Sequence, residues 1–161
     1  MSVKKSRAFK TVRESQVTLN HLVTPNDLNF SGFVFGGVIL KLIDHAAYVC
    51  AHKHAGGNCI TASFDRVDFK EPIYVGELVT MHASVNFVGH TSMEIGVKVT
   101  AENLKTNKIR HTNTSYVTMV AVDTHGKPKE VPGITPETKD EKRRYKEGEK
   151  RYKERKRRST R

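Results

Sequence analysis

The stretch "TPNDLNFSGFVFGGVILKLIDHAAYVCA", Thr24–Ala51, decides the fold of this chain. Its first part is rich in turn-forming residues and predicts a loop over residues 24–32. Its second part is an almost unbroken apolar run, which predicts a helix from about residues 35–37 to His54, before the glycines of "HAGGNC". Asp44 lies near the centre of this helix, and a carboxylate inside so apolar a segment calls for an explanation.

Helical periodicity divides the residues around Asp44 into two faces. At about 100° per residue, the larger apolar side chains fall opposite Asp44, while small or apolar side chains surround it. Because a helix that is apolar nearly all round is buried on more than one side, we expect a sheet on one side and a second subunit on the other. The sheet-facing set is Val38, Ile39, Leu42, Ile43, Ala46, Val49 and Cys50, and the subunit-facing set is Gly37, Leu40, Ala47, Tyr48 and Ala51. The alternative for Asp44 is a surface acid paired with Lys41, one turn earlier.

The pair Gly36–Gly37 stands at the expected start of the helix. Its simplest explanation is close packing at the helix entrance. Because the first N–H groups of a helix have no partner within it, the same entrance also predicts an oxyanion or anion site. Asn29, in the preceding loop, is by itself an ordinary turn residue.

After the helix, the period of the apolar residues changes from 3.6 to 2. The segments "VTMHASVNF" (79–87) and "MEIGVKV" (93–99) alternate apolar and polar residues, with "VGHTS" (88–92) as the turn between them. Further strands are predicted at about 15–22, 60–69 and 108–122. One long helix packed on about five antiparallel strands is an α+β layer arrangement.

The charge of the chain lies in its ends. The 161 residues carry a formal charge of +11, of which residues 1–15 supply +4 and residues 134–161 supply +7, so residues 16–133 are neutral. A globular nucleic-acid binder is expected to place basic residues on its folded surface, and this core does not. We therefore expect a basic N-terminal segment (1–14), one domain (15–133) and a highly charged basic tail (134–161).

The tail has almost no apolar residues, so a solvated or disordered appendage is its simplest interpretation. Pairs of Glu and Lys four residues apart could make it partly helical. A sharper alternative is an electrostatic arm for nucleic acid, an acidic partner or a membrane surface.

Other chemistries find little support. No Ser/His/Asp or Cys/His set, phosphate loop or dinucleotide fingerprint is visible. His52 and His54 lie two residues apart in a helix with no third ligand spaced nearby, so no metal site is predicted. Cys50 and Cys59 form no disulfide framework, and neither a secretory signal nor a long apolar run is present. These features favour a reduced, cytoplasmic protein.

Several stretches together resemble the hotdog-fold acyl-CoA thioesterases, in particular the group of YciA-like enzymes and cytosolic acyl-CoA hydrolases. They are "PNDLNFSGFVFGG" running into "ILKLIDHAA", "TASFDRVDFKEPIYVGELV", "VGHTSMEIGV" and "VTMVAVDTHGKPKEVP". The resemblance spans most of residues 17–132 and leaves out the basic ends. It implies a helix wrapped by an antiparallel sheet, a double-hotdog dimer, and commonly a trimer of such dimers with active sites at the dimer junction.

The resemblance also implies the site residues. The family's catalytic acid falls on Asp44, its companion amide on Asn29 of the facing subunit, and its helix start on Phe35, Gly36 and Gly37. Relatives often carry His in place of Phe35. The turn Gly89, His90, Thr91 and Ser92 corresponds to the region that holds coenzyme A, where several relatives carry Arg in place of His90. The segment Arg66, Val67, Asp68 and Phe69 corresponds to the wall of the pantetheine groove.

The expected reaction is hydrolysis of acyl-CoA to fatty acid and coenzyme A, with no further cofactor. A thiolate leaves readily, so the site needs only to deliver water and stabilise an oxyanion at the Gly37 N–H. Asp44 would act as general base or attack directly, and Asn29 would orient water or thioester. Candidate cations for the coenzyme A phosphates are Arg66, Lys98, Lys108 and Arg110, each of which could instead be a solvated surface charge. Two alternatives stay open: an acyl-CoA-binding module that does not hydrolyse, and a nucleic-acid-associated protein acting through its tails.

Overall fold

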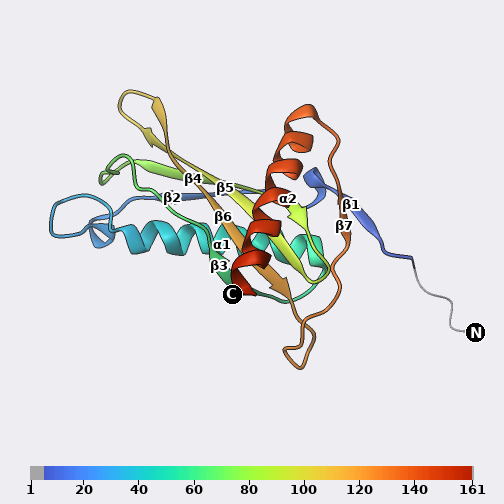
Figure 1. Cartoon of the computed structure of the whole chain (residues 1–161). Helices are drawn as coiled ribbons and strands as arrows, with labels where there is room; N and C mark the ends of the chain where they lie inside the picture. Colours follow the sequence, from blue (N-terminus) through green and yellow to red (C-terminus); the bar gives the residue numbers. More distant parts are fainter. Residues whose placement is uncertain (1–5, 161) are drawn as a thin grey trace, which may run out of the picture.

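A five-stranded antiparallel sheet wraps around one long helix, α1 (Gly36–Ala55), in the computed structural model, which describes residues 6–160 (Figure 1). Residues 1–5 of the expected N-terminal segment and residue 161 of the tail lie outside the described residues. The strands run in the order β2 (Val17–Leu22), β4 (Leu78–Val88), β5 (Ser92–Asn103), β6 (Lys108–Ala121) and β3 (Cys59–Phe64). The predicted α+β hotdog arrangement is confirmed.

Helix α1 has the predicted ends. Phe35 precedes its first turn in an extended conformation, and Gly56 ends it with a φ of 68°, a left-handed conformation that favours glycine. Of the residues expected to face the sheet, Ile39, Ile43, Ala46 and Cys50 are buried, while Val38, Leu42 and Val49 are half-buried.

The prediction for Ala47 and Ala51 is wrong. Both were assigned to the side that a second subunit covers, yet both are fully buried within one chain. The reason is that the curled sheet and its loops embrace a wider arc of the helix than a single stripe. Tyr48 and Lys41, further round the helix, are exposed.

The strands match the alternating pattern with one exception. The turn after β4 falls at the predicted residues, but β3 ends at Phe64, so the predicted continuation through Arg66–Phe69 is wrong. The Asp65 N–H still donates to the Tyr116 carbonyl at 3.0 Å, after which the chain leaves the sheet. Aspartates and a following proline are poor strand formers, and residues 65–73 form a loop instead.

The remaining elements are a second, two-stranded sheet and two short helices. Strands β1 (Phe9–Thr11) and β7 (Gly133–Thr135) pair in parallel, and two single-turn 3₁₀ helices, η1 (Val12–Glu14) and η2 (Pro25–Asp27), flank β2.

The charged tail is a helix, not a disordered appendage. Helix α2 (Lys139–Ser159) lies on the outer face of the sheet, opposite α1 (Figure 1). Thr138 and Glu141 form a capping box at its start. Its apolar contacts are few but well placed: the Phe87 ring of β4 packs between Tyr145 and Tyr152, with ring centroids 5.1 and 5.2 Å away.

A buried carboxylate fastens α2 to the sheet. Glu94 on β5 is 2% exposed and binds Arg151 at 2.7 Å and Arg155 at 3.0 Å. Arg155 also binds Asp65 at 3.1 Å, at the start of the 65–73 loop. Such partners on the sheet allow a polar helix to dock, which composition alone argued against.

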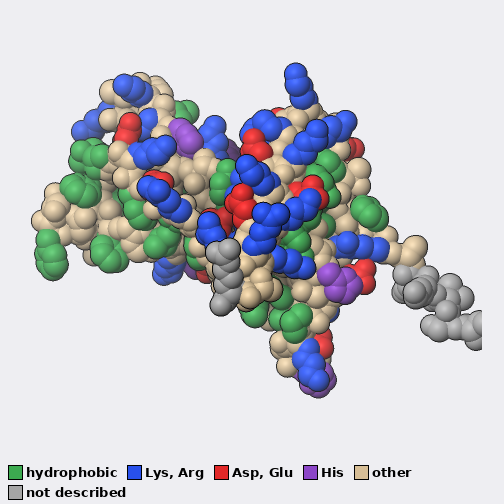
Figure 2. All heavy atoms as spheres, viewed as in Figure 1, with side chains coloured by type: hydrophobic (Ala, Val, Ile, Leu, Met, Phe, Trp, Pro, Cys, Tyr) green, Lys and Arg blue, Asp and Glu red, His purple; other side chains and the backbone are tan. Residues whose placement is uncertain are grey.

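Basic side chains remain gathered over α2 on its outward side (Figure 2). Contact of this surface with nucleic acid or another acidic partner stays a prediction. Neither described helix is long and apolar enough to cross a membrane.

Both cysteines are free thiols in the interior. Cys50 lies on α1 and Cys59 on β3, and both are buried. Burial raises the pKa of the Cys50 thiol to about 12 and that of the Cys59 thiol to about 11.

We expect the substitution Glu94→Gln to lower the free energy of unfolding by roughly 2 kcal/mol. Breaking a fully buried ion pair costs about 3–5 kcal/mol, and the two arginines here are about one-fifth exposed, which reduces the loss. Urea or thermal unfolding measures the effect. The matched control is Glu149→Gln, whose exposed pair with Lys153 predicts a change well under 1 kcal/mol; equal losses in both variants would contradict the anchoring role of Glu94.

Candidate active site

Asp44 is held by a hydrogen bond from the neighbouring strand. The Thr61 hydroxyl of β3 donates to Asp44 Oδ1 at 2.6 Å, and the carboxylate is half-buried. Within residues 6–160 Asp44 forms no salt bridge, so the alternative pairing with Lys41 is not present. Sequence reasoning missed Thr61, since a threonine in a strand carries no signal of its own.

The start of α1 presents free backbone amides. The N–H groups of Gly36 and Gly37 open the helix and have no acceptor within it, while Val38 N–H already donates to Phe35 O at 2.9 Å. A Cβ at Gly37 would lie 2.5 Å from the Phe35 ring, and a Cβ at Gly36 would lie 3.4 Å from the Phe69 ring. Two exposed aromatic rings therefore lie beside this entrance, and a side chain at Gly37 would displace the Phe35 ring.

Asn29 is fixed by its own loop. Its Oδ1 accepts hydrogen bonds from the N–H groups of Ser31 at 2.9 Å and Phe33 at 3.4 Å, and its N–H donates to Phe33 O at 2.8 Å. These contacts settle which end of the side-chain amide is oxygen. The Nδ2 group donates to no described residue and is left available for a ligand.

An inner cavity of about 420 Å³ joins Asn29 to the helix entrance. It lies between the start of α1, the 65–73 loop and β6. Its lining comprises Asn29, Phe33, Val34, Gly36, Ile39, Phe69, Lys70, Glu71, Pro72, Ile73, Thr112 and Asn113. The structure thus brings together the predicted residues Asn29, Gly36 and Phe69, whereas Asp44 is not part of the lining.

The other predicted groove residues lie away from this cavity. Arg66 is exposed and pairs with Asp68 at 2.9 Å, and Val67 between them is half-buried. Lys108 is exposed at the start of β6.

Arg110 is committed to other protein groups. It binds Glu77 at 2.5 Å, Glu71 at 3.0 Å and the Pro72 carbonyl at 2.7 Å. The hydrogen bond from Arg110 holds the pKa of Glu77 below its ordinary value, and the same bond raises the pKa of Arg110. Arg110 therefore braces residues 71–77, which bound the cavity, and its charge is already balanced.

The turn between β4 and β5 is also occupied. The Gly89 N–H donates to Ser92 O at 2.8 Å, so this donor is used within the turn. The carbonyls of Gly89, His90 and Thr91 accept from Arg7, Val131 and Ala121, respectively. The side chain of His90 is exposed, and the hydroxyls of Thr91 and Ser92 are half-buried.

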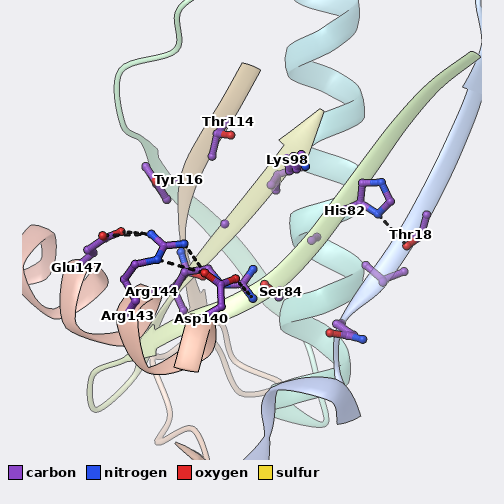
Figure 3. A pocket seen from close by; sticks show the side chains of 16 residues that line it. Thr18, His82, Ser84, Lys98, Thr114, Tyr116, Asp140, Arg143, Arg144 and Glu147 are labelled. Atoms are coloured by element: carbon purple, nitrogen blue, oxygen red, sulfur yellow. Dashed lines mark hydrogen bonds and ion pairs between the residues drawn. The ribbon is translucent and has the colours of Figure 1, made fainter. Parts of the chain in front are cut away.

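A second, outer cavity of about 640 Å³ lies between α2 and the opposite face of the sheet (Figure 3). Arg143 and Arg144 point into it, but Asp140 and Glu147 pair with them. The candidate cation Lys98 lies here, separated by the sheet from Asn29 and Gly36. A polar cavity lined by charged side chains does not suit an acyl chain.

Comparisons with known proteins identify the family to which this chain belongs. Residues 31–108 match the family model described as "Thioesterase superfamily". The chain is 41% identical to the cytosolic acyl coenzyme A thioester hydrolase of Mus musculus over 86% of its own length, and it spans 37% of that protein.

Two solved structures are close in both sequence and shape. The acyl-CoA hydrolase of Staphylococcus aureus, solved with butyryl coenzyme A and coenzyme A, is 39% identical, covers 94% of this chain and 93% of its own, and has a TM-score of 0.88. A hexameric acyl-CoA thioesterase is 42% identical over 94% of this chain and 97% of its own, with a TM-score of 0.90. The chain therefore belongs to the thioesterase superfamily. Within that superfamily it is an acyl-CoA thioester hydrolase.

We expect the contribution of Glu77 to the free energy of unfolding to depend on pH. Because its folded-state pKa is lowered, the stabilisation is present above the unfolded-state pKa and is lost as the pH falls through the folded-state value. Glu77→Gln should lower the free energy of unfolding at pH 7 by about 2 kcal/mol, and the difference from the unsubstituted protein should shrink below pH 4.5.

Thermal unfolding of both proteins between pH 3 and pH 7 checks this expectation. Glu71→Gln is the control, because Glu71 binds the same Arg110 but is about half exposed. A Glu77→Gln deficit that stays constant with pH would show that the charge is not responsible.

Proposed function

We propose that Asp44 activates a water molecule to hydrolyse acyl-CoA at a junction between two copies of the chain. The observation that carries this proposal is the separation of the reactive groups within one chain. Gly37 and Asp44 are seven residues apart on α1, which at 1.5 Å per residue is about 10 Å along the axis. A thioester bound at the Gly37 N–H needs its base from elsewhere, and an antiparallel second copy of α1 can bring one.

The exposed surface supports such a pairing. Among the described residues, strand β3 is an edge strand that pairs with β6 alone, and its Ile60 and Phe64 are exposed. An uncovered apolar edge of this kind favours pairing with another strand. Hydrophobic side chains also gather on the surface at the end of the molecule where α1 begins (Figure 2). In the segments that precede α1 and that connect β3 to β4, the exposed apolar residues are Phe30, Phe35, Phe69, Tyr74 and Val75. We extend to this chain the hexameric state named for the solved relative, arranged as the trimer of dimers that the resemblance implies.

The chemistry then needs few groups. The Gly37 N–H at the positive end of α1 binds the thioester oxygen, and Asn29 Nδ2 orients the thioester or the water. The Thr61 hydroxyl fixes one oxygen of Asp44, which leaves the other oxygen to take a proton from water as it attacks the carbonyl carbon. The tetrahedral intermediate expels coenzyme A as a thiolate, whose ordinary pKa of about 8.5 makes it a good leaving group, and the proton on Asp44 passes to the sulfur.

Direct attack by Asp44 would instead form an anhydride that water hydrolyses in a second step. We favour water because it needs no additional intermediate. A single turnover in ¹⁸O-labelled water reveals direct attack when water opens the anhydride at the Asp44 carbonyl, since the first molecule of acid released then carries unlabelled oxygen from Asp44. No cofactor is required by either route.

The coenzyme A phosphates need cations near the rim of the site. Arg66, Lys108 and His90 are exposed and remain candidates for these contacts. Cytosolic placement, as in the name of the mouse relative, belongs to the same proposal.

We expect Asp44→Asn to lower kcat at least a thousandfold with a KM that changes little, because the base is lost while the binding surface stays. Release of free thiol from acyl-CoA measures the rate. His45→Ala, an exposed position on the same helix, is the control. Turnover by Asp44→Asn at the original rate would sink the mechanism.

The shared site gives a sharper form of the same test. Asp44→Ala and Asn29→Ala should each be inactive alone, but co-expressed copies should form mixed dimers with one intact site. Random pairing predicts recovery of about a quarter of the original activity. No recovery from mixed dimers would place both residues in a single-chain site.

We expect Thr61→Val to lower kcat about tenfold or more, because a hydrogen bond to a charged group contributes about 1.5–3 kcal/mol and here it orients the base. Thr61→Ser keeps the hydroxyl and should restore most of the rate. Steady-state kinetics of both variants provide the measurement, and equal activity of the Val and Ser variants would remove Thr61 from the mechanism.

A further inference from the structure

The inner cavity has a buried end with one unsatisfied polar group. Three apolar side chains, Val34, Ile39 and Ile73, line this end, and each is less than a tenth exposed. Beside them stands Asn113 of β6, which is 5% exposed. An amide among apolar walls is unfavourable unless both of its ends find partners.

The strand explains why Asn113 points inward. Alternation along β6 puts Asn113 on the same face as Ser115, Val117 and Met119, all of which are buried against α1. A bulge opposite Val99 and Thr100 interrupts the pairing of β5 with β6 at this point, so that Thr112 also lines the cavity.

The hydrogen bonds of Asn113 are incomplete. Its Nδ2 donates to the Ser115 hydroxyl at 3.4 Å, while its Oδ1 is buried and accepts from no described group. Thr112 cannot satisfy it, because the Thr112 hydroxyl donates to the Val99 carbonyl at 3.2 Å. Asn113 Oδ1 therefore lacks a hydrogen-bond donor among the described residues.

We infer that Asn113 sets the length of acyl chain that the cavity accepts. The inference rests on the proposed function, in which the thioester lies at Asn29 and the Gly37 N–H, so that the acyl chain enters the apolar cavity beside them. The free Oδ1 keeps a water molecule at the buried end. A saturated chain long enough to reach this end displaces the water and leaves the amide unpaired, which a site penalises strongly.

The consequence is a preference for short acyl groups that end before Asn113. Exposed Phe69 lies beside Gly36 in the lining of the cavity, and Val34, Ile39 and Ile73 supply buried apolar walls. The limit on chain length is thus set by polarity at the inner end and not only by volume.

The test compares the unsubstituted protein with Asn113→Leu, a change of similar size that removes the polar group. The probes are acetyl-, butyryl-, hexanoyl-, octanoyl- and dodecanoyl-CoA. We expect kcat/KM for octanoyl- and dodecanoyl-CoA, relative to butyryl-CoA, to rise about tenfold in the variant. Thr114→Val is the matched control, because Thr114 is the next residue of β6 and lines the outer cavity; its profile should equal that of the unsubstituted protein.

A second variant separates polarity from space. Asn113→Ser enlarges the cavity but keeps a polar group, so it should retain the preference for short chains. A rise for long chains with Ser as large as with Leu would assign the limit to volume and overturn the inference, as would an unchanged profile in Asn113→Leu.

Binding gives the same profile without turnover. Dissociation constants of the five acyl-CoAs, measured by calorimetry in the Asp44→Asn background with and without Asn113→Leu, should show the same tenfold shift toward long chains. Absence of hydrolysis by the unsubstituted protein would contradict the proposed function alone. If Asp44→Asn proteins with and without Asn113→Leu bound the five acyl-CoAs with the same profile, the role of Asn113 alone would be contradicted.

Discussion

The close packing of α1 inside the curled sheet is the constraint on which the rest of the structure depends. Small side chains at Ala46, Ala47, Cys50 and Ala51 are fully buried, which lets strands approach the helix on a wide arc. The helix can then shift little along or around its axis, because interiors packed in this way resist displacement. Asp44 inherits that rigidity, and the Thr61 hydroxyl on β3 meets it at hydrogen-bond distance without a dedicated loop.

The first turn and the middle of the helix have different roles in the proposed site. The first turn begins with two glycines beside aromatic rings, and Gly36 lines the inner cavity. The middle of the helix carries the acid. In the proposed mechanism, the separation of these groups along a rigid helix leaves one chain without a complete site and is the physical reason for invoking a second copy.

Sequence patterns predicted the main body of the fold, since α1, its glycine stop and the alternating strands are local features that periodicity reports directly. The docking of α2 was out of reach, because it depends on Glu94, Phe87 and Asp65, which are distant in sequence and become partners only after the sheet forms. The burial of Ala47 and Ala51 was missed for a related reason: periodicity gives a face, but not how far the sheet curls around it.

The candidate site divides in the same way. Asp44, Asn29 and the glycines stood out by position or by resemblance, whereas Thr61 and Asn113 are ordinary strand residues until the structure shows what they face. Arg110 shows the opposite case: the sequence offered it as a candidate for its charge, and the structure shows that charge paired with Glu71 and Glu77.

The burial of the two cysteines affects whether the protein can form mixed disulfides with coenzyme A, its own product. Each turnover liberates coenzyme A, a thiol whose oxidised disulfide form exchanges with accessible protein thiolates to give mixed disulfides. Cys50 and Cys59 are out of reach of solvent and stay protonated, since burial keeps their pKa values far above neutrality. Oxidised coenzyme A therefore meets no accessible cysteine thiolate in this protein. Its accumulation should leave the core without mixed disulfides.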